Sequence, residues 1–521
     1  MLVEALVLAG TLLVVYAFRL YLEYCRVRGS VRDILTFVTF FSNETTLASA
    51  LNKSSRLVLG QFNFWLRKHD LYEPIGWDIS AAISLWPSVA VTYTVADPQV
   101  LKEIGSQRHK YPKPLAQYKP LDIFGRNIIS TEGDEWKKNR KIASPAFSER
   151  NNRLVWEESI RMLTEFFDVV WGDKEEISVD NFLGLSLQFG LRVISAAGFG
   201  RRMAWNAEHT IPQGHELSFE ETFQIASKDV FLKLLLPDWV PNLTERIRKT
   251  RLGFDELRVY LQDVIHERNS TGSAAEIDQV NLFSNLIEAN EQIEEEIARL
   301  DDSELIGNIF VFLLAGHETS SHTLCFAFAL LALYPEEQDK LYQHIMCVCP
   351  DRLPTYDDIP ALNRSLAVIY ETLRLLPAAV GVPKSTAEDT SFVLHNDQGH
   401  SKVIPVPKNT NLVIHATGVH YNPRYWKDPY EFRPDRFMGE WNRDAFIPFS
   451  VGARSCIGRR FSEVESIAIL TVLVKKYKIS VLEEPEFKHE SFEARKERVL
   501  RAQFGITHTP IRVPLTFTRR K

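Results

Sequence analysis

One short run around a single cysteine constrains this chain more than any other feature. The run extends from Phe449 to Gly458 and reads FSVGARSCIG. Its two glycines let the backbone come close to a flat ligand, and Arg454 can neutralise a carboxylate on that ligand's edge. The periodic apolar segment Phe461–Val474 predicts a following helix, whose positive N-terminal end would favour a thiolate at Cys456. We therefore interpret Cys456 as an axial ligand of haem iron, because thiolate donation helps to split the O–O bond of bound oxygen.

A lone cysteine is more often a small buried apolar residue than a ligand. Here five positions match a fixed spacing, and the run resembles the haem-binding loop of the cytochrome P450 family, F-x-x-G-x-R-x-C-x-G. The resemblance implies haem b (iron protoporphyrin IX) as the cofactor, with Cys456 on the metal. It also implies that Phe449, Arg454 and Gly458 contact the haem.

A polar island interrupts the long apolar segment Ser303–Leu333, which predicts a helix about 45 Å long at ~1.5 Å per residue. Ala315 and Gly316 leave room above a haem face, and Glu318 and Thr319 follow directly. The island is a helix kink with satisfied side chains, a polar stripe that faces another helix, or a distal oxygen site. Its six residues, AGHETS, resemble the oxygen-activation motif of the same family, which implies that Thr319 donates to bound dioxygen and Glu318 relays protons. His317 falls at a variable position and is expected to be a bystander at the site or its entrance.

Two further motifs resemble family elements behind and beside the haem. Glu371 and Arg374 lie three residues apart on one helical face, and alone they read as a surface pair of little energetic value. The segment 432–437, FRPDRF, resembles the family's F-x-P-x-R-F, which implies a buried structural triad of Glu371, Arg374 and Arg436.

The haem propionates need cationic or hydrogen-bonding partners. Trp136 and Arg140 stand at i and i+4, where both can donate to a carboxylate. By the resemblance these two residues, with Arg454, hold the propionates. Lys384 occupies a position that is commonly Arg in relatives, and a lysine can pair there without a bidentate fork.

The resemblance also indicates a substrate pocket. Small residues after Pro377 suggest room for a bulky, polycyclic molecule, and the loop Tyr111–Phe124 should close one side. The residues expected to line the pocket are Phe312, Ala378, Ala379, Val380, Val382 and Thr507.

Helical periodicity dominates the rest of the chain, which is predicted to be mostly α with small β-sheets. The 521 residues are 45% hydrophobic and 25% charged, an ordinary globular balance, and a net charge of −6 gives no reason to expect nucleic-acid binding. Five cysteines, an odd number, fit a reduced compartment better than a disulfide framework. We expect a single haem domain over residues 61–521, preceded by a linker with amphipathic pieces over 23–60. The predicted helices are Leu154–Val170, Asn181–Ala197, Phe219–Leu236, Thr244–Arg268, Ser303–Leu333 and Ala361–Leu375; the predicted strands are Ser88–Val95, Val403–Val406, Leu412–Ala416, Lys478–Leu482 and Val513–Phe517.

The N-terminal residues 1–22 are apolar and have three interpretations. A cleaved signal peptide lacks its basic start, and a buried helix remains open because the pure apolar run is shorter than ~20 residues. We favour a single transmembrane anchor, since the basic residues Arg26, Arg28 and Arg32 all follow the segment and place the body in the cytosol. The family then implies the endoplasmic reticulum membrane. The stretch Ile34–Phe41 is also apolar and is expected on the membrane surface.

The predicted reaction is insertion of one oxygen atom into a lipophilic substrate. The sequence holds no dinucleotide loop and no iron–sulfur cysteine cluster, so electrons should come from NADPH through a separate NADPH–cytochrome P450 reductase, with cytochrome b5 as a further candidate donor. A local basic face could steer that donor; it comprises Lys137, Lys138, Lys141, Arg459 and Arg460.

The tract from Tyr111 to Ser148 looks most like fungal membrane-bound members, which favours a secondary metabolite such as a terpenoid as substrate. Three alternatives remain: a fatty-acid or xenobiotic hydroxylase, a haem-thiolate isomerase or dehydratase that needs no electrons, and a non-enzymatic haem or lipid carrier.

Overall fold

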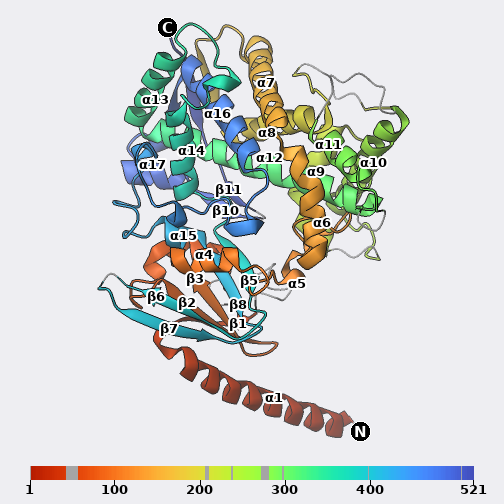
Figure 1. Ribbon diagram of the computed structural model, residues 1–521, viewed down its shortest axis with the longest axis vertical. Helices are drawn as coiled ribbons and strands as arrows, with labels where there is room; N and C mark the ends of the chain where they lie inside the picture. The colour runs from red at the N-terminus through yellow and green to blue at the C-terminus, as the bar shows by residue number, and fades with distance from the viewer. Residues whose placement is uncertain are drawn as a thin grey trace.

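A computed structural model describes residues 2–42, 57–205, 211–235, 239–271, 281–295, 299–396, 398–505 and 507–521. Helices fill the upper part of the molecule and the largest sheet lies below them, with the N-terminal helix projecting from the sheet end (Figure 1). The prediction of a mostly helical domain with small sheets is therefore confirmed.

The helices agree closely with the periodicity of the sequence. All six long helices that the sequence predicts are present, with ends shifted by a few residues, as is usual where end turns fray. The helices are α1 Leu2–Val31, α3 Gln61–Arg67, α4 Pro98–Ser106, α5 Leu115–Tyr118, α6 Gly133–Ala143, α7 Glu149–Phe166, α8 Phe182–Phe199, α9 Phe219–Leu235, α10 Glu245–Thr271, α11 Leu282–Glu291, α12 Asp302–Leu333, α13 Pro335–Val348, α14 Asn363–Leu375, α15 Ala416–His420, α16 Arg459–Lys476 and α17 Phe492–Val499.

The strands form one larger sheet and three small ones among the described residues. The larger sheet has the order β1-β2-β3-β8-β5, in which β1–β2 and β3–β8 pair in parallel and the other neighbours are antiparallel. The smaller sheets are β4-β12-β9, β6-β7 and β10-β11. The strands are β1 Leu35–Phe41, β2 Ile79–Trp86, β3 Ala90–Val95, β4 Glu176–Val179, β5 Gly381–Ser385, β6 Thr390–His395, β7 Ser401–Val406, β8 Asn411–His415, β9 Tyr477–Val481, β10 Ala502–Phe504, β11 His508–Pro510 and β12 Leu515–Arg519.

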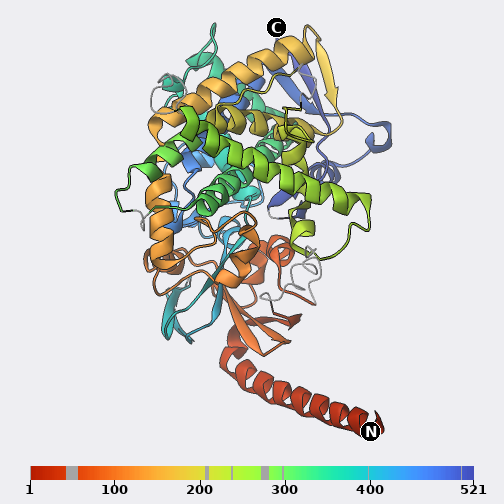
Figure 2. The ribbon, with the colours of Figure 1, turned by 90° about the vertical axis from the view of Figure 1, so that its right-hand side faces the viewer.

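Helix α12 runs through the middle of the helical part, with α8, α10, α14 and α16 packed around it (Figures 1 and 2). The helix begins at a capping box between Asp301 and Glu304, which satisfies its first free N–H groups. Most of its 32 residues are buried, because the helix is apolar on all sides. A Cβ on Gly190 of α8 would come within 2.3 Å of Ser321 Oγ, so a glycine there lets the two helices approach.

The N-terminal region differs from the sequence prediction. Helix α1 continues to Val31, past the expected boundary at residue 22, and β1 then joins the sheet as an edge strand beside β2. Within residues 23–60, where we expect a linker with amphipathic pieces, the structure has the end of α1 and strand β1, and residues 43–56 lie outside the described part. An apolar run of this length fits a strand and a membrane-surface segment equally well, and only the long-range pairing with β2 separates them.

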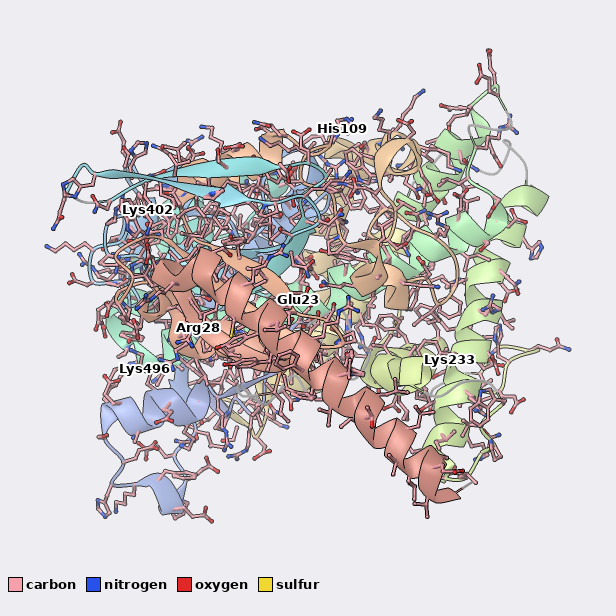
Figure 3. All side chains as sticks on the ribbon, turned by 90° about the horizontal axis from the view of Figure 1, so that it is seen from below. Glu23, Arg28, His109, Lys233, Lys402 and Lys496 are labelled. Carbon is pink, nitrogen blue, oxygen red and sulfur yellow. The ribbon has the colours of Figure 1, made fainter. Side chains whose placement is uncertain are left out.

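Helix α1 is long and apolar enough to cross a membrane: its most apolar 18-residue window has a mean hydropathy of 2.0, and no residue of that window is buried. It extends away from the body (Figures 1 and 2), and in the view from below it crosses in front of the body, with Glu23 and Arg28 toward its C-terminal end (Figure 3). This is consistent with a membrane anchor. Helix α8 passes the same test but is 72% buried, as expected of a core helix.

Candidate active site

The cysteine run forms a tight loop held by its own backbone and by α4. The Cys456 N–H donates to the Phe449 carbonyl at 2.9 Å, which closes the loop before α16 begins. Gly452 has a φ of 68°, and a Cβ there would lie 2.0 Å from the carbonyl oxygen of Gly105 in α4. Only glycine combines this backbone conformation with this contact, so Gly105 and Gly452 together fix where the thiol stands.

The Cys456 side chain has open space beside it although the loop lies among packed helices. Burial raises the pKa of the thiol, while the Gly458 N–H and the guanidinium groups of Arg140 and Arg459 act to lower that pKa. A free thiolate is therefore costly here, but a bound metal ion deprotonates a coordinating thiol and offsets that cost. The single sulfur and its donors fit an iron ligand better than a free nucleophile.

The predicted oxygen site lies on α12 close to the cysteine loop. Ser320 donates to Ser462 of α16 at 3.1 Å, which brings the Thr319 turn next to the start of the helix that follows Cys456. Ala315 is exposed although Leu314 and His317 beside it are buried, so the helix presents a gap at this level. The Thr319 hydroxyl donates to the Ala315 carbonyl at 2.7 Å, a back-bond within the helix.

Glu318 has an acid strength suited to proton transfer near neutral pH. Burial raises its pKa to about 7, and the Thr507 hydroxyl, within hydrogen-bonding reach, acts against that rise. Neighbouring His317 takes no part: its Nε2 bonds to the Leu187 carbonyl of α8 at 2.9 Å and its ring meets Phe223 of α9 edge-on. His317 thus packs between helices, and burial lowers its pKa to about 4.

A buried cluster of cations stands where the sequence predicts propionate partners. Arg454 donates to the Thr131 carbonyl at 3.0 Å and to the Glu132 carboxylate, and its Nε is buried with no hydrogen-bond partner among the described residues. Lys384 and Lys113 lie close enough to act on the same groups, and burial lowers their pKa to about 8 and about 7. With both lysines protonated, as nearby propionates would favour, three cations and one carboxylate carry two positive charges, which would match the two carboxylates on the edge of a haem.

Lys113 and Glu132 are members of this cluster that sequence reasoning missed. Lys113 donates to the Ile129 carbonyl at 2.8 Å, and its backbone N–H donates to Glu132 at 3.1 Å. Both residues lie in loops before α6, and no short-range spacing connects them to Arg454. A lysine inside the expected pocket loop Tyr111–Phe124 was the one available signal.

Trp136 and Arg140 occupy different places in this arrangement. Trp136 is buried between two guanidinium groups, with Arg454 at 4.0 Å and Arg108 at 4.9 Å from the ring centroid. Arg140 donates to the Ser455 carbonyl at 3.3 Å and acts on the Cys456 thiol. The structure therefore places Trp136 with the cation cluster and Arg140 at the cysteine loop.

The three residues of the expected triad meet in the core. Arg374 donates to both oxygens of Glu371, at 2.7 and 2.8 Å, and Arg436 donates to Glu371 at 3.1 Å. Glu371 and Arg374 are fully buried, and Arg374 also donates to the carbonyls of His420 and Pro429, each at 2.8 Å. The guanidinium thus ties α14 to the segment that leads toward the cysteine loop.

The residues expected in the pocket are only partly together. Thr507 reaches Glu318, and the backbone carbonyl of Ala378 accepts from His508 at 2.9 Å, so these segments meet. Ala379 is exposed and Val382 is half-buried. Placing Val380 in the pocket is not supported, because its side chain packs in a separate small core with Leu59, Phe64, Ala82 and Val413. Phe312 is buried edge-on against Phe147, which lies beside Gly458.

The expected basic face is largely neutralised. Four of its five residues form ion pairs with carboxylates, so the face offers less net positive charge than the sequence suggests. The pairs are Lys137–Asp134 at 2.5 Å, Lys138–Glu304 at 2.7 Å, Arg459–Glu463 at 2.8 Å and Arg460–Glu463 at 3.7 Å.

The buried acid Glu465, near the predicted oxygen site, was not predicted from the sequence. Glu465 of α16 is 1% exposed, and burial raises its pKa to about 8, while the hydroxyl of Ser320 acts against that rise. Glu465 is therefore a neutral carboxylic acid at pH 7, next to the Ser320–Ser462 contact.

A long helix with an acid–alcohol pair beside a single-cysteine loop and a cation cluster is the arrangement of haem-thiolate proteins. Comparison with known proteins agrees. The family model for Cytochrome P450 matches residues 79–502. Cytochrome P450 monooxygenase 124 of Postia placenta is 47% identical over 464 residues, covering 88% of this chain and 89% of that protein.

More distant relatives belong to the same group. Cytochrome P450 monooxygenase ORF6 of Penicillium roqueforti is 26% identical and covers 80% of this chain and 78% of its own. Cyclooctat-9-en-7-ol 5-monooxygenase of Streptomyces melanosporofaciens is 24% identical, and the match covers 76% of this chain and 82% of that protein. This chain belongs to the cytochrome P450 family. It is thus an oxidoreductase of the monooxygenase type, and membership implies haem iron.

Proposed function

We propose that the protein inserts one oxygen atom from O2 into a lipophilic small molecule, with electrons from NADPH delivered by a separate reductase. The observation that carries the proposal is the Cys456 loop, fixed by Gly105 and Gly452 and placed beside the Thr319 turn of α12. Haem, when bound, supplies the iron at which oxygen is activated.

The residues of this chain then have separate tasks. Cys456 holds the iron, and the Gly458 N–H and Arg140 stabilise negative charge on its sulfur. Arg454, Lys384 and Lys113 hold the propionates, with Trp136 packed against Arg454. These residues would hold the cofactor at the cysteine loop, near the Thr319 turn of α12.

Glu318 and Thr319 lie on α12, where we assign Glu318 to proton transfer and Thr319 to hydrogen bonding with oxygen. Glu318 can both hold and release a proton near pH 7, because its pKa is about 7. Thr319 can exchange its Ala315 back-bond for a hydrogen bond to a ligand. An intact acid–alcohol pair favours oxygen insertion over an isomerase or dehydratase reaction, which needs no proton delivery to oxygen.

We propose a bulky secondary metabolite, such as a terpenoid, as the substrate class. Small residues at Ala378 and Ala379 and the gap at Ala315 leave room for a wide molecule. The likeness to fungal monooxygenases supports this class, and one relative is named for acting on cyclooctat-9-en-7-ol. Fatty acids and xenobiotics are the alternative class. Spectral titration of the ferric protein with terpenoid and fatty-acid panels separates them, and a response to linear acids alone would contradict the first.

For localisation we propose a single-pass anchor by α1 in the endoplasmic reticulum membrane, with the body in the cytosol. The apolar length of α1 and the basic residues after it support this orientation. Membrane fractionation of a fusion to a fluorescent protein, with protease protection of the C-terminus, tests it; a protected C-terminus would refute it.

The decisive test of the function is a carbon monoxide difference spectrum of the reduced holoprotein. Cys456→Ser should abolish the thiolate signature, whereas Cys347→Ser, a free exposed cysteine elsewhere, should retain it. Expression with a reductase and metabolite profiling then tests oxygen insertion. A wild-type protein without the thiolate signature, or products that form without NADPH, would overturn the proposal.

A further inference from the structure

One face of α12 leads from the oxygen site toward the β10–β11 hairpin. Glu318, His322 and Phe326 are spaced four residues apart and therefore lie on the same side of the helix. Thr507, between β10 and β11, reaches both polar members. Its hydroxyl lies within hydrogen-bonding reach of Glu318, and its Oγ1 lies 3.0 Å from His322 Nδ1. One hydroxyl thus connects a carboxyl to an imidazole.

His508 continues this line into the hairpin. It follows Thr507 directly, and its ring centroid lies 5.3 Å from that of Phe326. The same ring stacks on Phe504 at 4.7 Å and tilts against Trp65 at 4.3 Å. His508 therefore packs between Phe326 of α12 on one side and Phe504 and Trp65 on the other.

A cavity of about 970 Å³ lies beside Trp65 and Phe504. Its lining includes Trp65 of α3, Phe504 of β10 and Lys68, which directly follows α3, together with residues of α17. No residue of the cysteine loop and neither Glu318 nor Thr319 is among those that line it. The ring of His508 thus contacts two residues that line this cavity, Trp65 and Phe504, and one residue of α12, Phe326.

The groups around Glu318 suit proton transfer without net charge. The titratable neighbours are His317 and His322 on α12, His508 on β11 and Glu465 on α16, with Lys68 beyond His508. Burial keeps both His322 and His508 neutral by lowering the pKa of each to about 3. His317 faces α8 instead, and Glu465 is held near Ser320. A neutral imidazole can take a proton on one nitrogen and release one from the other.

We propose that Thr507, His322 and His508 form the route by which protons from the α3–α17 cavity reach Glu318. After Glu318 gives up a proton, Thr507 donates its hydroxyl proton to the carboxylate and accepts the Nδ1 proton of His322. His322 regains a proton on Nε2 from His508 through an intervening water, because both ring nitrogens of His508 are buried with no hydrogen-bond partner among the described residues. His508 takes its replacement proton from water in the cavity. One proton moves from solvent to Glu318, and no group is oxidised or reduced. The inference rests on the proposed monooxygenase function and names the positioning residues of its proton supply.

The first test measures the titration of Glu318 in the ferric holoprotein by difference infrared spectroscopy, with Glu318→Gln to assign the carboxyl band. Thr507→Val removes the hydroxyl and keeps the shape. It should raise the midpoint of the Glu318 titration, because the lost hydrogen bond favours the carboxylate. Thr507→Ser restores the hydroxyl and should restore the wild-type midpoint. An unchanged midpoint in Thr507→Val would overturn the proposed contact.

The second test measures proton delivery as reductase-supported NADPH oxidation in H2O and D2O. Thr507→Val, His322→Gln and His508→Phe should each slow oxidation roughly tenfold and enlarge the solvent isotope effect, while Thr507→Ser stays near wild type. Equal loss in Thr507→Val and Thr507→Ser, or unchanged isotope effects in the histidine variants, would show a packing role and refute the route. A missing thiolate spectrum in wild type would instead refute the proposed function, and the infrared titration does not depend on that spectrum.

Discussion

Glu465 gives a sharp prediction about stability and pH. Its carboxyl is neutral in the folded protein up to a pKa of about 8, whereas the ordinary value is 4.5. The folded state holds a proton that the unfolded state releases. The free energy of unfolding of the wild type therefore falls as the pH rises from 4.5 through about 8. Glu465→Gln keeps the shape and neutrality of the acid but cannot ionise.

The magnitude follows from linkage. Each pH unit in that window changes the free energy of unfolding by about 1.4 kcal/mol. From about pH 6 to about pH 7.5 the wild type should therefore lose about 2 kcal/mol relative to Glu465→Gln. With an unfolding entropy of roughly 2 cal/mol/K per residue over 521 residues, that difference is about 2 °C in Tm.

The assay is calorimetric or circular-dichroism melting of both proteins across this pH range, at one scan rate. The Tm difference between Glu465→Gln and wild type should widen in favour of the variant as the pH rises. Glu486→Gln, an exposed substitution, controls for loss of one surface charge. Curves that stay parallel for wild type and Glu465→Gln would refute the reasoning that a buried neutral acid stands at this position.

Three further predictions concern the cysteine loop, the core triad and the cation cluster. Gly452→Ala should lower the free energy of unfolding by about 3 kcal/mol and reduce haem absorbance per protein, because its Cβ meets the backbone of Gly105. Gly439→Ala should change neither, because no atom lies within 4 Å of the added Cβ. Glu371→Gln should cost about 3–5 kcal/mol in thermal melting, since Arg374 is left buried without its carboxylate; a loss below 1 kcal/mol would contradict a buried triad. Lys113→Met should speed haem transfer to apomyoglobin on the order of tenfold, through loss of a charged hydrogen bond. Equal transfer rates in both proteins would remove Lys113 from the cofactor contacts.

Short-range spacing explains which parts of the site the sequence could predict. The Cys456 loop and the Glu318–Thr319 pair lie within runs of ten residues or fewer, so their arrangement is local. Lys113 and Arg454 are separated by over three hundred positions, and their meeting depends on the packing of the whole domain. The same holds for Thr507 and His322, which chain topology alone brings together.

The fold shows the same division. The long apolar run of α12 predicts a helix without ambiguity, because 32 residues exceed the length of a strand. Strand β2, in contrast, reads ISAAISLW, and its alanines and serines weaken the β signal although the strand is buried. Strand β1 carries the apolar composition of a strand, but its role depends on a partner about forty residues away.

The direct passage from α1 through a single turn into β1 has a mechanical consequence. A flexible tether would let the body tumble above a bilayer, but here Val31, the last residue of α1, and Ile34, in the turn that follows, are buried in the core at the sheet end. Lys402 and Asp33 add a contact of 3.6 Å across that junction. Tilting the helix would therefore tilt the sheet with it. In a bilayer, the lipid thickness that sets the helix tilt would then also set the orientation of the body relative to the membrane plane.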